Sequence, residues 1–483
     1  MSTVRRNMLW MAASQGCAFV TQFVTTVVLA RLLTPYEMGV FAAALAVVGL
    51  LVVLRNIGLG SYVVRAVDLT PAILRTTFTV NALLSLLIAG AVAGLSVLGG
   101  AVLGEPGVRD VLLLIAVVPL LSIFEFRPSA VLERLGQFRS IAGVNALRAL
   151  TGGGVAIGLA LDGHSYMSLA YGQLAGGVVG MIGVNLAGRR HASLRMGLAD
   201  WRDALRYGMH MLAIGGIAAA TSRLAELALA RMLGLGALGM YSRATGVANL
   251  VWENVQMVIV RTMFVDLAEQ RREGRSLRHS YLRVVALMTA LLWPVFVGLA
   301  VLSGPVVMLL YGAQWVRAAL PLSLLSLSFL PLAAMVMATG IMQLSERTAE
   351  QARLDAIRSA VGLAMFLGGS LVSIDWAAAS RIGEAALAFL LFRPWVQRMT
   401  DTREADYTPI YLRSLALTVA AVVPAAAVMA WFDWNPQAPL LPLLGAVLAG
   451  GVLWAGLLLW MRHPLLDEAR WLLGRFGRGP AAR

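Results

Sequence analysis

The stretch LARLLTPYEMGVF at residues 29–41 recurs 200 residues later as LARMLGLGALGMY at residues 229–241. The identical positions are Leu29/Leu229, Ala30/Ala230, Arg31/Arg231, Leu33/Leu233 and Gly39/Gly239. Each copy joins the end of one apolar stretch to the start of the next, so the repeat marks a turn between two helices. Self-similarity at a fixed offset in an apolar chain is typical of a duplicated membrane transporter.

The composition indicates a protein of the lipid bilayer. The 483 residues are 59% hydrophobic and 13% charged, with a mean hydropathy of +0.78, which exceeds what a soluble domain keeps in solution. The net charge of +14 is not interpreted as a nucleic-acid signal, because no basic soluble domain is available to present it. The single cysteine, Cys17, lies in an apolar stretch and is expected to be structural.

A transmembrane helix needs about 20 apolar residues, and the chain contains fourteen stretches that we expect to span. The predicted spans are 8–30, 38–63, 78–103, 111–126, 140–161, 166–187, 207–232, 237–265, 284–310, 319–344, 356–374, 376–395, 412–432 and 439–461. The first lacks a small-residue cleavage pattern, so we interpret it as an uncleaved helix rather than a secretory signal.

The distribution of arginine predicts the orientation. The chain has no lysine, so arginine supplies all 39 basic residues. With a cytoplasmic N-terminus, 29 arginines fall on the inner side, 6 within spans and only 4 at outward ends. The positive-inside rule therefore favours an N-in, C-in multi-pass protein.

The spacing of the repeat predicts the domains. A unit of six spans makes both copies enter the membrane in the same direction, which predicts an all-α fold with two parallel six-helix bundles and a substrate cavity between them. The predicted segments are a first bundle at 1–190, a basic cytoplasmic linker at 191–206, a second bundle at 207–398, two extra helices at 412–461 and a basic amphipathic tail at 462–483. Small-residue helix contacts are expected at Gly90/Gly94, Gly154/Gly158 and Gly176/Gly180.

The first repeat, extended through LARLLTPYEMGVFAAALAVVGLL and NIGLGSYVVR, and the second, LARMLGLGALGMYSRATGVANLVWENVQ, resemble Wzx-type polysaccharide flippases. These belong to the multidrug/oligosaccharidyl-lipid/polysaccharide (MOP) exporter superfamily. The chain departs from many relatives in having Asn56, beside Arg55, where they carry an acidic residue before the IGLG-like turn.

The resemblance implies the function. Such flippases move undecaprenyl-diphosphate-linked oligosaccharide from the cytoplasmic to the periplasmic leaflet of the bacterial inner membrane, for O-antigen, capsule or exopolysaccharide synthesis. The partners implied are this lipid-linked substrate, membrane lipids, and polysaccharide polymerase or chain-length proteins. No nucleic acid, metal or cofactor is expected.

Arginines within spans are the candidate ligands for the diphosphate headgroup, because a guanidinium pairs with phosphate and a charge in the membrane needs a cavity or a partner. The candidates are Arg148, Arg55, Arg223, Arg261 and Arg243, with Arg381 as the sixth arginine in a span. Two of the six have an i, i+3 carboxylate that can neutralise them: Arg223 with Glu226, and Arg381 with Glu384. Arg55, Arg261 and Arg243 can also snorkel to an interface.

Arg148 lies deepest and has no carboxylate near it in sequence, which makes it the leading candidate. Its alternative role is to pair with Glu125 or Glu253 from another helix.

Energy coupling by ATP through a Walker A loop is excluded by the absence of lysine. The carboxylates available for H⁺ or Na⁺ coupling are Glu226, Glu253, Glu125 and Glu384. The five histidines are scattered without metal-ligand spacing and are expected at the surface.

Two other functions compete with the flippase. A multidrug cation antiporter of the same fold would need an acidic, aromatic-lined cavity, which the excess of arginine opposes. A membrane polysaccharide polymerase or ligase would present a large outward loop, whereas the predicted outward connections are short. The chain is therefore predicted not to be an enzyme.

Overall fold

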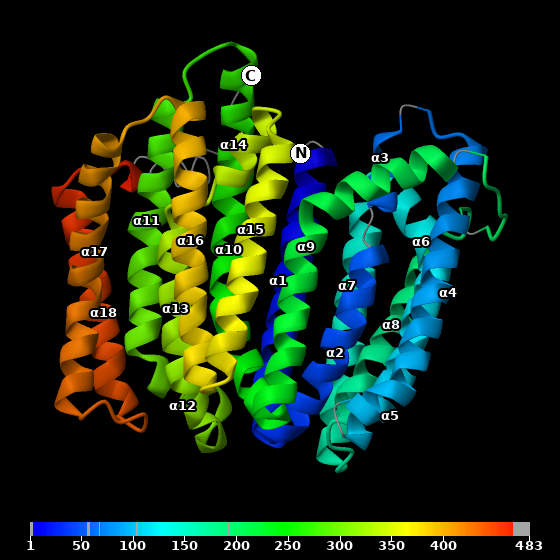
Figure 1. The fold of residues 1–483 in the computed structure, drawn as a ribbon, viewed down its shortest axis with the longest axis horizontal. Coiled ribbons are helices and arrows are strands. Elements are labelled where there is room, and N and C mark those ends of the chain that lie inside the picture. The colour runs from blue at the N-terminus through cyan, green and yellow to red at the C-terminus, as the bar shows by residue number, and fades with distance from the viewer. Residues whose placement is uncertain are drawn as a thin grey trace. The chain divides into compact units, whose positions relative to one another are not determined.

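The computed structural model describes residues 3–55, 58–66, 68–102, 105–191, 193–199 and 201–466, and every regular element in these ranges is helical (Figure 1). The contacts divide the chain into two compact units, Met1–Gly239 and Met240–Arg483. The predicted division into two six-helix bundles stays a prediction.

The first unit is built from α1 to α9. Their bounds are α1 Thr3–Leu32, α2 Pro35–Arg55, α3 Leu59–Arg65, α4 Pro71–Val102, α5 Pro106–Ile115, α6 Val117–Arg134, α7 Phe138–Leu161, α8 Met167–Ala187 and α9 Trp201–Leu233. Within this unit α7 packs on α1 and α8, α2 packs on α9, and α6 packs on α4 and α8.

The second unit contains most of α10 and the remaining helices. Their bounds are α10 Leu235–Arg272, α11 Arg278–Val301, α12 Ser303–Tyr311, the 3₁₀ turn η1 Ala313–Ala318, α13 Ala319–Ala333, α14 Ala338–Leu344, α15 Thr348–Ser370, α16 Ile374–Thr400, α17 Glu404–Trp431 and α18 Leu440–Trp460. Helix α17 packs on both α11 and α18, and α16 packs on α13 and α15.

Helices occupy most of the described residues of all fourteen predicted spans, but four of these spans are interrupted within their length. The predicted helix 38–63 is divided into α2 and α3, and 111–126 into α5 and α6. Spans 284–310 and 319–344 are divided in the same way. Within the described part of the chain, 9 helical segments are long and apolar enough to cross a membrane. The protein is thus a multi-pass membrane protein, and the count of fourteen stays a prediction.

The repeat forms the predicted turns. Helix α1 ends at Leu32 and α2 begins at Pro35; 200 residues later α9 ends at Leu233 and α10 begins at Leu235. In the second turn Gly234 has φ of 86°, a conformation that favours glycine because it has no Cβ.

The two copies also touch each other. A Cβ on Gly39 would overlap the carbonyl of Leu235, and a Cβ on Gly239 would overlap the carbonyl of Pro35. Positions 35 and 39 correspond to positions 235 and 239 of the repeat. The contact therefore has the same partners in both directions, as in a pseudo-two-fold arrangement.

The expected small-residue contacts are only partly correct. Gly176 and Gly180 do lie at the contact of α7 with α8, where Gly152 and Gly172 also pack backbone on backbone. A Cβ added to Gly90, Gly94, Gly154 or Gly158 would meet no described atom of another helix within 4 Å, so the expectation for these four was wrong. Their spacing matched a packing motif that is common in apolar helices.

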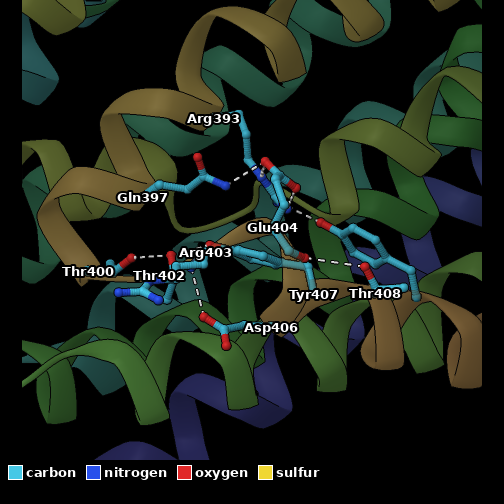
Figure 2. A network of polar contacts seen from close by, with 10 residues as sticks. Arg393, Gln397, Thr400, Thr402, Arg403, Glu404, Asp406, Tyr407 and Thr408 are labelled. Carbon is cyan, nitrogen blue, oxygen red and sulfur yellow. Dashed lines mark hydrogen bonds and ion pairs between the residues drawn. The ribbon is translucent and has the colours of Figure 1, made fainter.

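A polar cluster joins the end of α16 to the start of α17 (Figure 2). Arg393, only 4% exposed, donates to both carboxylate oxygens of Glu404 at 3.2 and 2.9 Å. It also donates to the Tyr411 hydroxyl at 2.7 Å, and its guanidinium carbon lies 3.4 Å from the ring centroid of Tyr407. The bidentate pair and the ring contacts fix this buried arginine in one place.

Candidate functional site

A polar cavity of about 410 Å³ lies in the first unit, where α2 ends and α3 begins. Side chains from α2, α3, α4 and α6 line it. The polar lining residues are Arg55, Ser61, Asn81, Ser122, Glu125, Ser129 and Glu133. Four of these, from Ser122 to Glu133, follow one another at helical spacing on a single face of α6.

The interruption between helices α2 and α3 contributes to the lining of this cavity. Helix α2 ends at Arg55, and Gly58 adopts a left-handed conformation with φ of 68° before α3 begins. Gly58 and Gly60 both line the cavity, where the absence of side chains leaves space. Asn56, which was noted for its departure from the family pattern, lies outside the described residues.

Arg55 is half-buried at the cavity wall. Its Nη1 donates to Ser122 Oγ at 2.8 Å, and Ser122 in turn donates to the carbonyl of Pro119 at 2.6 Å. Ser85 lies 3.2 Å from the same Ser122 oxygen. Of the five N–H donors of Arg55, one is engaged in a hydrogen bond within the described part of the chain, so the guanidinium has donors left for an anion.

Asn81 supplies a second donor. The residue is 6% exposed and lines the cavity, and its Nδ2 has no hydrogen-bond partner among the described residues. A buried amide without a partner costs about 1–3 kcal/mol. An oxygen of a ligand in the cavity would remove that cost.

Arg148 pairs with Glu125, one of the two partners considered from the sequence. Its Nη2 donates to Glu125 Oε1 at 2.6 Å, and the side chains are 38% and 19% exposed. A Cβ on Gly180 would overlap the guanidinium, so α8 accommodates Arg148 by presenting a glycine. The cavity itself is lined by Glu125, which also interacts electrostatically with Arg55. One carboxylate thus lies close to two arginines.

Both arginines that have a carboxylate three residues away in the sequence form the expected ion pair with it. Arg223 donates to Glu226 at 2.8 Å, and Arg381 donates to Glu384 at 2.6 Å. Arg381 additionally donates to Tyr241 at 3.1 Å and lies 4.4 Å from the ring centroid of Phe366. Each pair neutralises an arginine within its own helix.

The remaining candidates lie elsewhere. Arg243 lies in α10 near Tyr311, and its buried Nε has no hydrogen-bond partner among the described residues. Glu253 is exposed on the same helix. The side chain of Arg261 lies outside the described residues.

Sequence reasoning missed the roles of four residues. Asn81 and Ser122 carry no charge and gave no signal among many polar residues of apolar helices. Arg393, near the end of the predicted span 376–395, was not counted among the six arginines within spans and was not recognised as buried. The expectation that the histidines are at the surface is wrong for His463, which is 2% exposed. Each depends on contacts between helices that are distant in sequence.

The fold is shared with a solved transporter structure. The lipid II flippase MurJ, in an inward closed conformation, matches 94% of this chain and 99% of its own with a TM-score of 0.73, at 13% identity. The expected all-helical MOP exporter fold is confirmed, and the class of protein is a multi-pass membrane protein of that fold.

The sequence match is more specific. Residues 28–320 match the family described as polysaccharide biosynthesis protein, and the chain belongs to this family. It is 27% identical over 329 residues to the succinoglycan biosynthesis transport protein ExoT of Rhizobium meliloti (strain 1021), covering 68% of this chain and 66% of that protein. It is 25% identical over 310 residues to the lipopolysaccharide biosynthesis protein WzxC of Escherichia coli (strain K12), covering 63% of each. The chain thus matches just under two thirds of the length of both relatives.

Proposed function

We propose that the protein is a flippase that moves undecaprenyl-diphosphate-linked oligosaccharide from the cytoplasmic to the periplasmic leaflet for surface polysaccharide synthesis, by alternating access. The observation that carries the proposal is the cavity with Arg55 and Asn81 as available donors, in a chain of the polysaccharide biosynthesis family. The protein acts as a transporter rather than an enzyme, with polymerase and chain-length proteins as downstream partners.

The donors of the cavity suit a diphosphate headgroup. Phosphate oxygens accept hydrogen bonds from a guanidinium in a bidentate manner, and arginine stays charged at every physiological pH. Asn81 adds a neutral donor without adding charge. In the N-in orientation that the arginine distribution favours, α2 ends at the cytoplasmic side, where the substrate is loaded.

Of the four carboxylates considered for coupling, Glu125 is the one that we propose. Glu226 and Glu384 each pair with an arginine of their own helix, and Glu253 is exposed. Glu125 lines the cavity, pairs with Arg148 and interacts electrostatically with Arg55, so an arriving anion would change its electrostatic surroundings. Both H⁺ and Na⁺ remain candidates for the coupling ion.

The lining of the cavity favours the flippase over a multidrug cation antiporter. A multidrug cation site would be dominated by carboxylates. Here one of the two lining carboxylates, Glu125, is paired with Arg148, and Arg55 lines the same wall; Glu133 forms no ion pair among the described residues. We therefore rank the antiporter below the flippase, and a polymerase or ligase below both.

The test uses the native host with the chromosomal copy deleted and complemented by variants. We expect the deletion to trap lipid-linked oligosaccharide on the cytoplasmic leaflet and to remove the surface polysaccharide. Arg55→Gln should reproduce both effects at normal membrane abundance, while Arg189→Gln, an exposed arginine away from the cavity, should complement fully. Normal surface polysaccharide with Arg55→Gln would exclude Arg55 from the site, and a deletion strain that traps no precursor would overturn the function.

A further inference from the structure

Three arginines of the first unit gather away from the Arg55 cavity. Arg75 lies near the start of α4, Arg127 in the second half of α6, and Arg195 in residues 193–199, which follow α8. Arg127 interacts electrostatically with both of the others. None of the three forms an ion pair with a carboxylate in the part of the chain that the structure describes. Like charges held together without a counter-ion repel one another, so the arrangement favours a bound anion.

The segment after α8 is fixed against the two helices at two points. The backbone N–H of Gly197 donates to Thr79 Oγ1 of α4 at 3.0 Å. The carbonyl of Ser193 accepts a hydrogen bond from Arg127 Nη1 of α6 at 3.3 Å. Arg195 lies midway between these two residues, so its backbone is held beside both helices. The gathering of the arginines is therefore built into the packing of this segment.

The arginines have donors left for a ligand. Of the five N–H groups of Arg127, the described residues engage one, and its buried Nε has no partner among them. Arg75 lies directly against the segment, because a Cβ on Gly197 would be 3.1 Å from the Cβ of Arg75. A phosphate group presents several acceptor oxygens, so a single one can take hydrogen bonds from more than one guanidinium.

The exposed side chains of the same segment are largely apolar. Leu194, Met196 and Leu198 are 59%, 68% and 51% exposed, and they alternate with Arg195 and Gly197. In the N-in orientation that the arginine distribution favours, α8 ends at the cytoplasmic side, at the level of the inner-leaflet headgroups. Apolar side chains together with basic ones hold a surface segment to an anionic membrane. A free phosphate ion would leave these apolar side chains in water, whereas a phospholipid would cover them.

We propose that Arg75, Arg127 and Arg195 bind the phosphate group of an anionic phospholipid of the inner leaflet, whose acyl chains contact the apolar side chains of residues 193–199. This lipid is distinct from the transported substrate. Arg127 is not among the α6 residues that line the Arg55 cavity, because it lies on another face of that helix. The bound lipid would attach the segment after α8 to the membrane.

The test measures lipid binding to the full-length purified protein by native mass spectrometry, with phosphatidylglycerol and phosphatidylethanolamine as probes. Arg195→Gln and Arg75→Gln should each weaken phosphatidylglycerol binding about fivefold, since one arginine near an anionic lipid surface contributes about 1 kcal/mol. Phosphatidylethanolamine binding should be unaffected. Arg190→Gln is the matched control, because Arg190 is exposed, also follows α8, and is not among the charges that act on Arg127.

A second arm tests the contact with the acyl chains. Met196→Ser keeps every arginine and removes apolar area, so it should weaken the binding of phosphatidylglycerol. Inorganic phosphate at millimolar concentration should not displace the lipid, because the ion lacks the apolar contacts. Undecaprenyl phosphate, as a third probe, should be retained less well than phosphatidylglycerol.

Four outcomes would overturn the proposal. Equal losses with Arg195→Gln and Arg190→Gln would mean general surface charge, and equal losses for both phospholipids would mean no headgroup selection. Displacement of phosphatidylglycerol by inorganic phosphate would mean a free-anion site. Preferential retention of undecaprenyl phosphate would assign the arginines to the path of the transported lipid.

Discussion

Gly39 and Gly239 hold equivalent positions in the two repeats, and each lies against a backbone carbonyl of the other copy. Neither position has room for a methyl group. The two repeats are therefore related by a direct contact in the structure as well as by sequence similarity.

We predict that Gly39→Ala and Gly239→Ala each destabilise the protein by about 1–3 kcal/mol, because overpacked contacts shift the backbone. Thermal unfolding in detergent would measure the effect. Gly246→Ala, on α10 with no described atom within 4 Å of its added Cβ, should be neutral or mildly stabilising. Since both glycines serve one contact, the double variant should cost less than the two single costs added; full additivity would contradict a shared contact.

Arg148 and Glu125 are predicted to act as one unit in transport. Arg148→Ala should lower delivery of the lipid-linked oligosaccharide while membrane insertion stays intact, and Glu125→Gln should do the same. The double variant is expected to be no worse than the poorer single variant, with a coupling of about 1 kcal/mol. Delivery can be followed as surface polysaccharide at matched protein abundance. Independent, additive losses would assign Arg148 a headgroup contact of its own.

Asn81→Leu is predicted to separate stability from function. Removing a buried donor that has no partner should leave the free energy of unfolding unchanged or raise it by about 1 kcal/mol. Transport should nevertheless fall, because the cavity loses a donor. The free energy of unfolding and the transport activity should be measured on the same preparations of the variant. Normal transport by Asn81→Leu would show that Asn81 is not part of the site.

The Arg393 and Glu404 pair should respond asymmetrically. Arg393 is 5% exposed at its side chain and Glu404 is 71% exposed. We expect Arg393→Ala to cost about 3 kcal/mol through lost packing and ring contacts. Glu404→Gln should cost about 1 kcal/mol or less, because water solvates that carboxylate. Comparable losses in thermal unfolding would show that the ion pair itself, rather than the aromatic surroundings, stabilises this junction.

The sequence predicted what depends on local spacing. The turns at 33–34 and 234 followed from the repeat, and the ion pairs of Arg223 and Arg381 followed from carboxylates three residues away on the same helix. Span bounds failed where a single left-handed glycine, Gly58, interrupts an apolar run without changing its composition.

The sequence could not predict which residues of different helices would be brought into contact by packing. Glu125 was one of two possible partners for Arg148, and only the contact of α6 with the helices around it decides between them. Asn81 and His463 became notable through burial, which depends on residues of other helices that pack around them.

The position of Glu125 affects the rate at which the proposed flippase can release its substrate. A phosphate that reaches Arg55 would come near the carboxylate of Glu125, which lines the same cavity and interacts electrostatically with Arg55. The negative charge of Glu125 is expected to lower the affinity of the site for the headgroup. A lower affinity would let the substrate dissociate sooner, so the transporter could return to its loading conformation sooner.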